Sequence, residues 1–289
     1  MTKPHPEVAG SPGASVSAIQ AHYDLSDDFY RLWLDESLTY SCALWEAGDD
    51  LATAQARKLD FHVRQAHAAG ARRVLDIGCG WGSLLRRLVD RHGVQSAVGL
   101  TLSESQLKHV EGLRHPGIEI RLEDWRDHAP AEPYDAILGL GVMEHLVRPD
   151  TPAPDRIETY RRFFARCRAL LRPGGWMSLQ TIAYGTGAFT TGAISAIFPE
   201  SDLPRLSQIA AAAEGHFEIA ALRNDREHYA RTCREWFARL RAHRAEAAAR
   251  VGAHTANHYE RFLDASSRGF DAQIFCLFRI QLRRIDTPG

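Results

Sequence analysis

The chain has 289 residues, of which 45% are apolar and 25% charged, as is typical of a globular protein with a sizeable core. Lys and Arg number 35 against 36 Asp and Glu, so the net charge of -1 argues against binding to nucleic acid or to an acidic membrane surface. The five cysteines lack metal-binding spacing and no apolar run reaches about 18 residues, so we expect a cytoplasmic protein without a metal site or a transmembrane helix, in peripheral contact with a membrane at most.

The first part of the chain divides into a tail and a cap. Residues 1–15 are rich in Pro, Gly, Ala and Ser and lack the apolar core of a signal peptide, which predicts a disordered tail. Residues 16–50 are rich in aromatic side chains and predict short helices and a loop, which form an N-terminal helical cap. A single domain then spans residues 16–289, continuing with a helix over residues 51–69.

Strand and helix patterns alternate through most of the remaining chain. The predicted strands are 73–77, 97–102, 118–122, 136–140, 176–182, 217–222 and 273–284. The predicted helices are 81–92, 103–113, 157–171 (closed by the stop signal 172–175), 228–250 and 257–269. This alternation predicts an α/β fold with a doubly wound parallel sheet. Residues 183–215 break the rhythm with several Gly and Pro, and predict an insertion that caps the site.

A glycine-rich turn after the first predicted strand is the strongest functional signal. Gly78, Gly80 and Gly82 lie where the strand becomes a helix, with a G-x-G-x-G spacing that differs from the G-x-G-x-x-G of dinucleotide sites. The helix N-terminus favours a carboxylate, and Asp76 can accept hydrogen bonds from an amine. An α-amino acid tail carries both groups, which indicates S-adenosylmethionine; the alternative is a turn that uses glycine for packing only.

Polar residues after the next two strands can complete this pocket. Thr101 and Gln106 are the polar groups nearest to the ribose position, although Ser103 and Gln106 also form a capping-box pattern that could serve the helix alone. Asp124 and Trp125 follow the third strand and can bind an adenine through an acceptor and a flat face. A Trp125 packed on the protein surface is the alternative.

Four groups of segments resemble the cyclopropane fatty acid synthase family, which includes the mycolic acid cyclopropane synthases. The most specific are HYDLSDDFY at 22–30 and TYSCA at 39–43, and the match runs from about residue 16 to 284. The other two groups are 76–82 with 98–103, and 197–204 with 228–230. The resemblance implies a Rossmann-like class I methyltransferase fold, with a seven-stranded, mostly parallel sheet whose last strand is antiparallel.

The resemblance also assigns residues to a cofactor site and to an active centre. With the glycine loop, the cofactor residues are Tyr23, Tyr40, Ser41, Asp76, Gly78, Gly80, Gly82, Thr101, Gln106, Asp124 and Trp125. In the family, residues matching Cys42, Glu144 and Tyr229 hold a bicarbonate base together with a His on the fifth strand. The family reads Leu-His-Thr-Ile there, whereas this chain has Gln180 in place of the His. Since an amide cannot titrate, we expect bicarbonate binding to be weakened or altered. The sequence therefore supports ring closure less firmly than it supports methyl transfer.

These residues favour a C-methyltransferase that adds a methyl(ene) carbon to the alkene of a lipid, polyketide or isoprenoid acceptor. Attack of the alkene on the sulfonium methyl leaves a carbocation, and loss of a proton then gives a cyclopropane or a methyl branch. Five aromatic residues can either stabilise that cation or form ordinary core: Phe29, Tyr30, Trp33, Tyr229 and Trp236. Glu144 is the candidate acid or base, with helix capping as its alternative, and His145 is expected to pack beside it.

Two other functions stay open at this point. The pair Glu144-His145 also occurs in small-molecule amine N-methyltransferases that resemble this family. Gln180 alone suggests a catalytically inactive protein that binds S-adenosylmethionine, against which Cys42 and Tyr229 argue. The low net charge favours a soluble or carrier-bound acceptor over a bilayer phospholipid. No pattern defines the acceptor or the oligomeric state.

Overall fold

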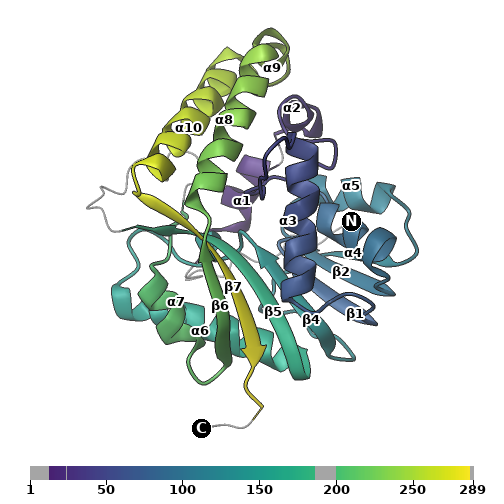
Figure 1. Ribbon diagram of the computed structural model, residues 1–289. Coiled ribbons are helices and arrows are strands. Elements are labelled where there is room, and N and C mark those ends of the chain that lie inside the picture. Colours follow the sequence, from purple (N-terminus) through teal and green to yellow (C-terminus); the bar gives the residue numbers. More distant parts are fainter. Residues whose placement is uncertain (1–12, 24, 186–199, 287–289) are drawn as a thin grey trace.

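The computed structural model describes residues 13–23, 25–185 and 200–286, and these form one α/β sheet protein (Figure 1). The strands are β1 (Arg73–Ile77), β2 (Ser96–Thr101), β3 (Ile118–Leu122), β4 (Tyr134–Leu140), β5 (Leu171–Tyr184), β6 (Phe217–Asn224) and β7 (Phe275–Arg284). They form a seven-stranded sheet in the order β3-β2-β1-β4-β5-β7-β6, in which only β7 runs antiparallel to its neighbours. The predicted class I methyltransferase fold is thereby confirmed.

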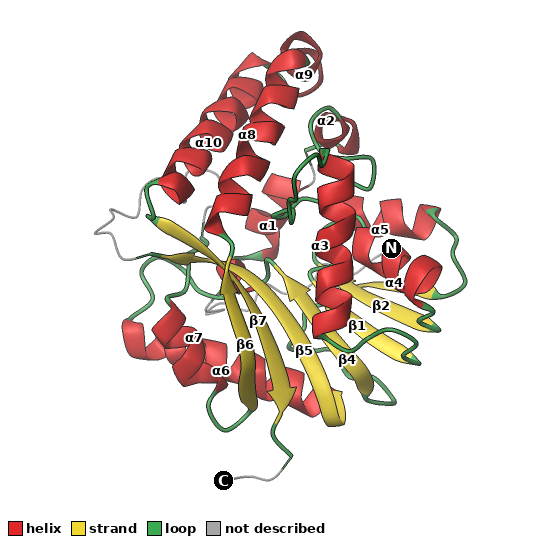
Figure 2. Ribbon diagram, in the orientation of Figure 1, coloured by secondary structure: helices red, strands yellow, loops and turns green. Residues whose placement is uncertain are grey.

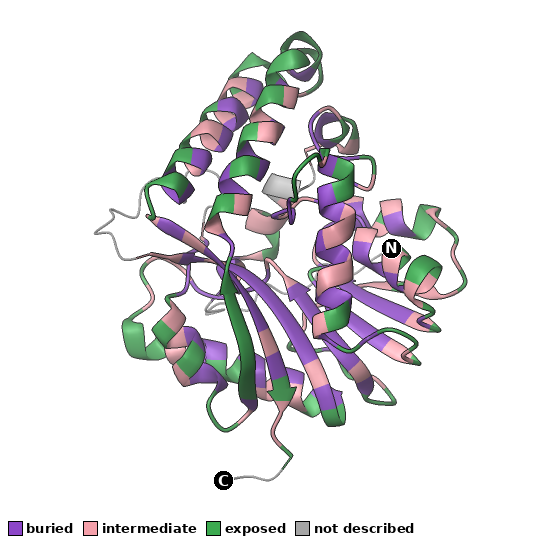
Figure 3. Cartoon of the chain, in the orientation of Figure 1, coloured by how far each residue is buried: buried purple, intermediate pink, exposed green. Residues whose placement is uncertain are grey.

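Both faces of the sheet are covered by helices, which explains why apolar residues occupy both faces of its central strands. On one face lie α3 (Leu51–Gln65), α4 (Ser83–His92) and α5 (Glu104–Gly112), and on the other lie α6 (Ala153–Leu170) and α7 (Leu206–Ala213) (Figure 2). Consecutive residues of β1 enter opposite layers, since Val74 packs with α3 and α4 whereas Leu75 packs with α6. The edge strand β6 is exposed along nearly its whole length (Figure 3).

A second helical layer stands above the carboxyl ends of the parallel strands. It consists of α8 (Arg226–Ala242), α9 (Arg244–Val251) and α10 (Ala253–Asp271) (Figure 1). These helices pack with the short α2 (Asp27–Arg31) around a cluster of aromatic side chains. The N-terminal segment also contributes α1 (Val16–Tyr23). The sequence predicted the helices α8 to α10 without placing them in the cap. No helix of the described residues is long and apolar enough to cross a membrane.

Several predicted boundaries change in the structure. The stop signal 172–175 lies inside β5, where a β-bulge separates the pairing of Leu171 with Tyr134 from that of Trp176 with Ala136. The helix predicted at 228–250 is two helices that meet at His243.

The predicted tail and insertion are described only in part. Residues 1–12, most of the predicted tail, and residues 186–199 lie outside the described residues. Ala14 is packed and donates a hydrogen bond to the carbonyl of His145. In the insertion, Ser201 and Leu203 line the cavity described below, whereas α7 packs against α6 and lines none of it. The cap insertion as a whole stays a prediction.

Candidate active site

A cavity of about 530 Å³ lies at the carboxyl ends of β1, β2, β4 and β5, beneath the helical cap. The strand order reverses between β1 and β4, which is where ligands bind in open α/β sheets. Twelve of the fifteen predicted site residues line this one cavity: Tyr40, Ser41, Asp76, Gly78, Gly80, Thr101, Gln106, Asp124, Trp125, Glu144, Gln180 and Tyr229. Residues from distant segments of the chain therefore form a common site.

The glycine loop has the backbone geometry that its sequence predicts. Gly78, Gly80 and Gly82 have φ angles of 78°, 55° and 79°, in the left-handed region that favours glycine. Gly82 is the N-cap of α4 and has no side chain to cap it, so the first N–H groups of this helix are available to a ligand. Gly82 itself does not line the cavity.

We expect Gly82→Ala to destabilise the protein by about 1–3 kcal/mol, because an added Cβ would combine a strained φ with a packing conflict. That Cβ would lie 2.8 Å from Cγ2 of Val110 on α5. Urea unfolding followed by circular dichroism measures the effect. Gly112→Ala is the matched control, because no atom lies within 4 Å of a Cβ placed there. Equal stability of the two variants would contradict the expected conflict.

Asp76 and Lys58, an acidic and a basic residue, both line the part of the cavity where the amino acid tail of the ligand is expected. Asp76 is 2% exposed, its Oδ1 has no hydrogen-bond partner, and burial raises its pKa to about 7. An amine bound in the cavity could use this oxygen, so the site fits the amino group of an S-adenosylmethionine tail. Lys58 of α3 also lines the cavity and donates to Oγ of Ser41 at 2.8 Å.

Only one half of the capping box predicted for Ser103 and Gln106 is present in the structure. Ser103 caps α5 by accepting from the backbone N–H of Gln106, as predicted. The Gln106 side chain does not return to Ser103, because its Oε1 accepts from the hydroxyl of Thr101 at 2.7 Å. Thr101 and Gln106 are thus joined at the cavity wall, where they can meet the hydroxyl groups of a ribose.

Trp125 and Asp124 lie at the expected adenine end. Trp125 packs edge-on against Phe163, with ring centroids 5.1 Å apart, and contributes to the cavity lining. The Asp124 carboxylate accepts from the backbone and the guanidinium of Arg126 at 2.6–2.9 Å. A carboxylate has further lone pairs, so a bound adenine amine would share this acceptor with Arg126. The roles in adenine binding stay predictions.

Glu144 lies deep in the cavity, on a short 3-10 helix (Met143–His145) after β4. Its Oε1 accepts from the backbone N–H of Ile182 at 2.7 Å, whereas Oε2 has no hydrogen-bond partner. Burial raises the pKa of Glu144 to about 7, so the carboxyl can hold or release a proton near neutral pH. Burial lowers the pKa of His145 to about 4, which keeps this residue neutral beside it.

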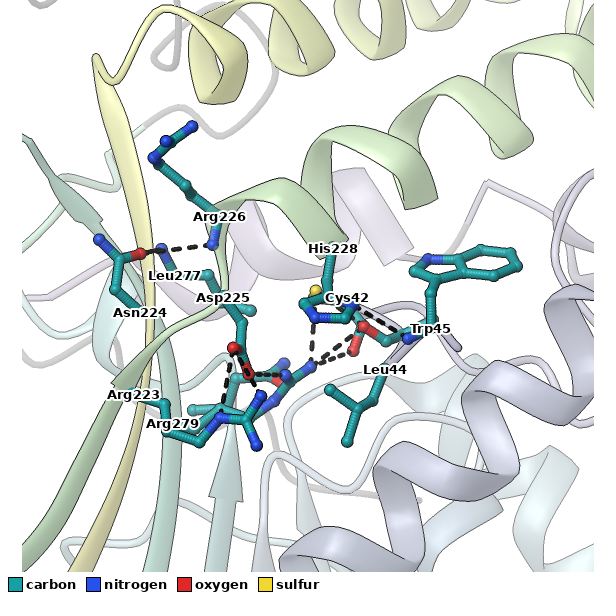
Figure 4. A network of polar contacts seen from close by, with 12 residues as sticks. Cys42, Leu44, Trp45, Arg223, Asn224, Asp225, Arg226, His228, Leu277 and Arg279 are labelled. Carbon is teal, nitrogen blue, oxygen red and sulfur yellow. Dashed lines mark hydrogen bonds and ion pairs between the residues drawn. The ribbon is translucent and has the colours of Figure 1, made fainter. Parts of the chain in front are cut away.

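The Gln180 amide is held in one orientation by a buried network. Its Oε1 accepts from Nε of Arg279 at 3.0 Å, and lies 3.3 Å from Nε2 of His62. Because a guanidinium can only donate, the amide oxygen must face Arg279, which leaves the amide N–H₂ group for the cavity that Gln180 lines. Arg279 is fully buried, pairs with Asp225 and donates to the carbonyls of Cys42 and Ala43 (Figure 4).

Cys42 is predicted to belong to the active centre, and its position differs from those of Glu144, Gln180 and Tyr229. Its thiol is buried but does not line the cavity, and burial raises its pKa to about 12. Both its backbone carbonyl and its sulfur accept from Nη2 of Arg279, at 3.1 and 3.5 Å, and so join the network. The side chain of Tyr23, at the end of α1, lies outside the described residues.

The cavity continues into an apolar chamber between α8 and α10. Tyr229 stacks on Phe270 with ring centroids 4.7 Å apart, and Trp236 lies on the same side. The chamber is lined by Tyr229, Cys233, Trp236, Phe262, Leu263, Phe270, Phe275 and Leu277. The other three aromatic residues proposed to stabilise a cation are absent from the lining and belong to the core: Phe29, Tyr30 and Trp33.

The sequence analysis missed three buried polar residues around this site, namely Lys58, His62 and Arg279. Two of them carried a signal, because the polar residues Gln55, Lys58 and His62 recur at helical spacing among the apolar residues of α3 that face the protein. A polar stripe on the buried face of a helix indicates a site. Among the described residues, no group of three or more His, Cys, Asp or Glu could hold a metal ion.

Comparisons with known proteins agree with this geometry. The family model described as mycolic acid cyclopropane synthetase matches residues 11–280. Cyclopropane mycolic acid synthase 2 of Mycobacterium leprae is 33% identical over 278 residues, which cover 87% of this chain and 88% of that protein. The cyclopropane synthase MmaA2 from Mycobacterium tuberculosis superposes with a TM-score of 0.86 at 30% identity, over 95% of this chain and all of that one. Mycolic acid cyclopropane synthase CmaA1 in complex with SAH and CTAB gives 0.85 at 30% identity, over 93% and 98%.

Proposed function

Because the chain belongs to the mycolic acid cyclopropane synthetase family of S-adenosylmethionine-dependent methyltransferases, we propose that it transfers a methylene carbon to the alkene of an unsaturated lipid. One observation carries the proposal. A single cavity is lined by the glycine loop, by the apolar chamber and by Glu144, whose Oε2 has no hydrogen-bond partner. An acyl or isoprenoid chain fits the apolar lining of this chamber, and it could arrive free or on a carrier.

The residues of the cofactor end hold and orient the methyl donor. S-adenosylmethionine, when bound, supplies an electrophilic methyl group. Asp76 would accept from its amine, Thr101 and Gln106 would face its ribose, and Trp125 would cover its adenine. The glycine loop allows close approach of the backbone. Held by these residues, the donor would share the cavity with an alkene bound in the chamber, and transfer would require the two in line.

The residues of the chamber would then stabilise a cationic intermediate of the substrate and shield it from water. The π electrons of the alkene form the new bond to carbon as the bond from that carbon to sulfur breaks, which leaves a carbocation on the substrate. The faces of Tyr229 and Trp236 can stabilise this charge, and the apolar lining excludes water that would trap it. Removal of a proton from the transferred carbon releases the electron pair that closes the ring.

The proton acceptor is the point at which this chain departs from its relatives. We propose that Glu144 and the N–H₂ group of Gln180 together hold the base, which in the family is bicarbonate. The groups fit such an anion, because Gln180 can donate to it, and Glu144 can either donate as an acid or accept from its hydroxyl. Since Gln180 carries no charge, the anion is held more weakly than by a protonated His.

Product analysis with S-adenosylmethionine that carries a trideuterated methyl group tests the proposal. The protein is incubated with unsaturated acyl, isoprenoid and amine acceptors, and the products are analysed by mass spectrometry and NMR. A cyclopropane retains two of the three deuterium atoms, because the base removes one of them. A methyl branch retains all three and would show that methyl transfer occurs without ring closure. Label found only on nitrogen would replace the proposal with an amine N-methyltransferase, and no transfer would favour a binding protein.

A further inference from the structure

Lys58 is an unusual residue for the wall of a cavity. The chain contains only three lysines among its 35 Lys and Arg residues, and Lys58 is fully buried. Within the described residues, no carboxylate lies within 4.0 Å of its ammonium group. The ammonium group donates a hydrogen bond to the neutral hydroxyl of Ser41 at 2.8 Å, which leaves two of its three N–H donors for a ligand.

The surroundings of Lys58 are fixed independently of any ligand. Gln55, one turn earlier on α3, donates to the carbonyls of Thr39 and Ser41 at 3.2 and 2.9 Å. The carboxylate of Asp35 accepts from the backbone N–H groups of residues 37 and 39. The loop before α3 is therefore held in place, with the Ser41 hydroxyl and the Lys58 ammonium together at the cavity wall.

A buried cation requires a compensating charge. Burial, together with the nearby Arg279, lowers the pKa of Lys58 to about 7, which reflects the cost of an ammonium without an anion. The carboxyl of Asp76 interacts electrostatically with Lys58 and has an unused oxygen of its own. One cationic and one anionic group, each with unused atoms in the lining of the same cavity, are complementary to the zwitterion of an α-amino acid.

We propose that Lys58 binds the α-carboxylate of the cofactor's methionine tail, together with the Ser41 hydroxyl, while Asp76 accepts from the amine. This assignment rests on the proposal that the cofactor is S-adenosylmethionine. Lys58 supplies a charged side chain for the cofactor, which neither the glycine loop nor the TYSCA motif contains. Lys58 is thereby a determinant of affinity for the amino acid tail, separate from the groups around the adenine.

Calorimetric titration of Lys58→Met with three probes tests this role. S-adenosylhomocysteine carries the whole tail, its decarboxylated analogue keeps only the amine, and 5′-methylthioadenosine lacks the tail. We expect Lys58→Met to lower the affinity for S-adenosylhomocysteine by about tenfold to a hundredfold, the usual range for the loss of a hydrogen bond to a charged group. The affinities for the other two probes should change less than about twofold. Lys108→Met, at an exposed lysine on α5, is the matched control and should bind all three as the parent protein does.

The three probes separate the possible failures. An equal loss of affinity for all three would show that Lys58 only supports the fold, and would overturn the proposal. Unchanged binding of S-adenosylhomocysteine would overturn it as well. If the parent protein binds neither S-adenosylhomocysteine nor 5′-methylthioadenosine, the cofactor assignment fails, and the inference about Lys58 fails with it.

Discussion

Replacing Glu144 with Gln is expected to reduce product formation by about 10²–10⁴-fold, the usual contribution of a positioned acid or base. The Gln side chain keeps an oxygen that can accept from the backbone of Ile182, so the local geometry is preserved. What it loses is the ability to hold or release a proton at the atom that faces the cavity. Product formation at saturating acceptor measures the loss.

The same substitution is expected to stabilise the protein without ligand. The pKa of Glu144 is about 7 in the folded protein and near the ordinary 4.5 in the unfolded chain. Between these pH values the folded protein keeps a proton that the unfolded chain has released, so stability falls as pH rises through this window. At pH 8 the penalty is up to about 3 kcal/mol, and below pH 4 it is absent. Urea unfolding should therefore show Glu144→Gln to be more stable than the parent at pH 8 and equal to it at pH 4.

Glu260→Gln is the matched control for this prediction. Glu260 is a buried glutamate of α10 that does not line the cavity, so its replacement should leave product formation near that of the parent. The prediction is contradicted if Glu144→Gln is as active as the parent and no more stable than it at pH 8. The carboxylate would then neither destabilise the folded protein nor take part in the chemistry.

The features of the fold that the sequence predicted are those encoded by neighbouring residues. The strand at 73–77 and the turn at Gly78 and Gly80 follow from short apolar runs and from glycine spacing, which act locally. The position of α8 to α10 does not follow in this way. Their periodicity predicts helices with an apolar face, but it does not say whether that face covers the sheet or stands above it.

The candidate site shows the same division. The residues proposed for the cofactor lie in short motifs, and most of them line one cavity. The network around Gln180 joins α3, β5, β7, the junction between β6 and α8, and the loop before α3, so its members share no local pattern. Arg279 is the clearest case, because an Arg among the alternating residues of a predicted final strand is expected to face solvent. Only the packing of α3 and the N-terminal loop over this part of the sheet makes it fully buried.

Arg279→Met is expected to destabilise the protein by about 3–5 kcal/mol, because it leaves Asp225 without its buried partner. Arg223 also contacts Asp225 at 3.0 Å, which places the expected cost at the lower end of this range (Figure 4). The Arg279→Met, Asp225→Asn double variant removes both charges, and most of the lost stability should return. Urea unfolding at pH 7.5 measures each step. Arg283→Met, at an exposed position on the same strand, should stay within about 0.5 kcal/mol of the parent.

The double variant also separates stability from the orientation of Gln180. Without the Nε donor of Arg279, the Gln180 amide can rotate and turn its oxygen toward the cavity, where it would repel an anion instead of donating to it. We therefore expect the double variant to fold well but to form product at least about tenfold more slowly, because misplaced groups lose much of their catalytic effect. Added bicarbonate should restore part of the rate if the anion is bound more weakly. If stability and rate recover together, Arg279 serves only the fold, and Gln180 needs no partner to hold its amide.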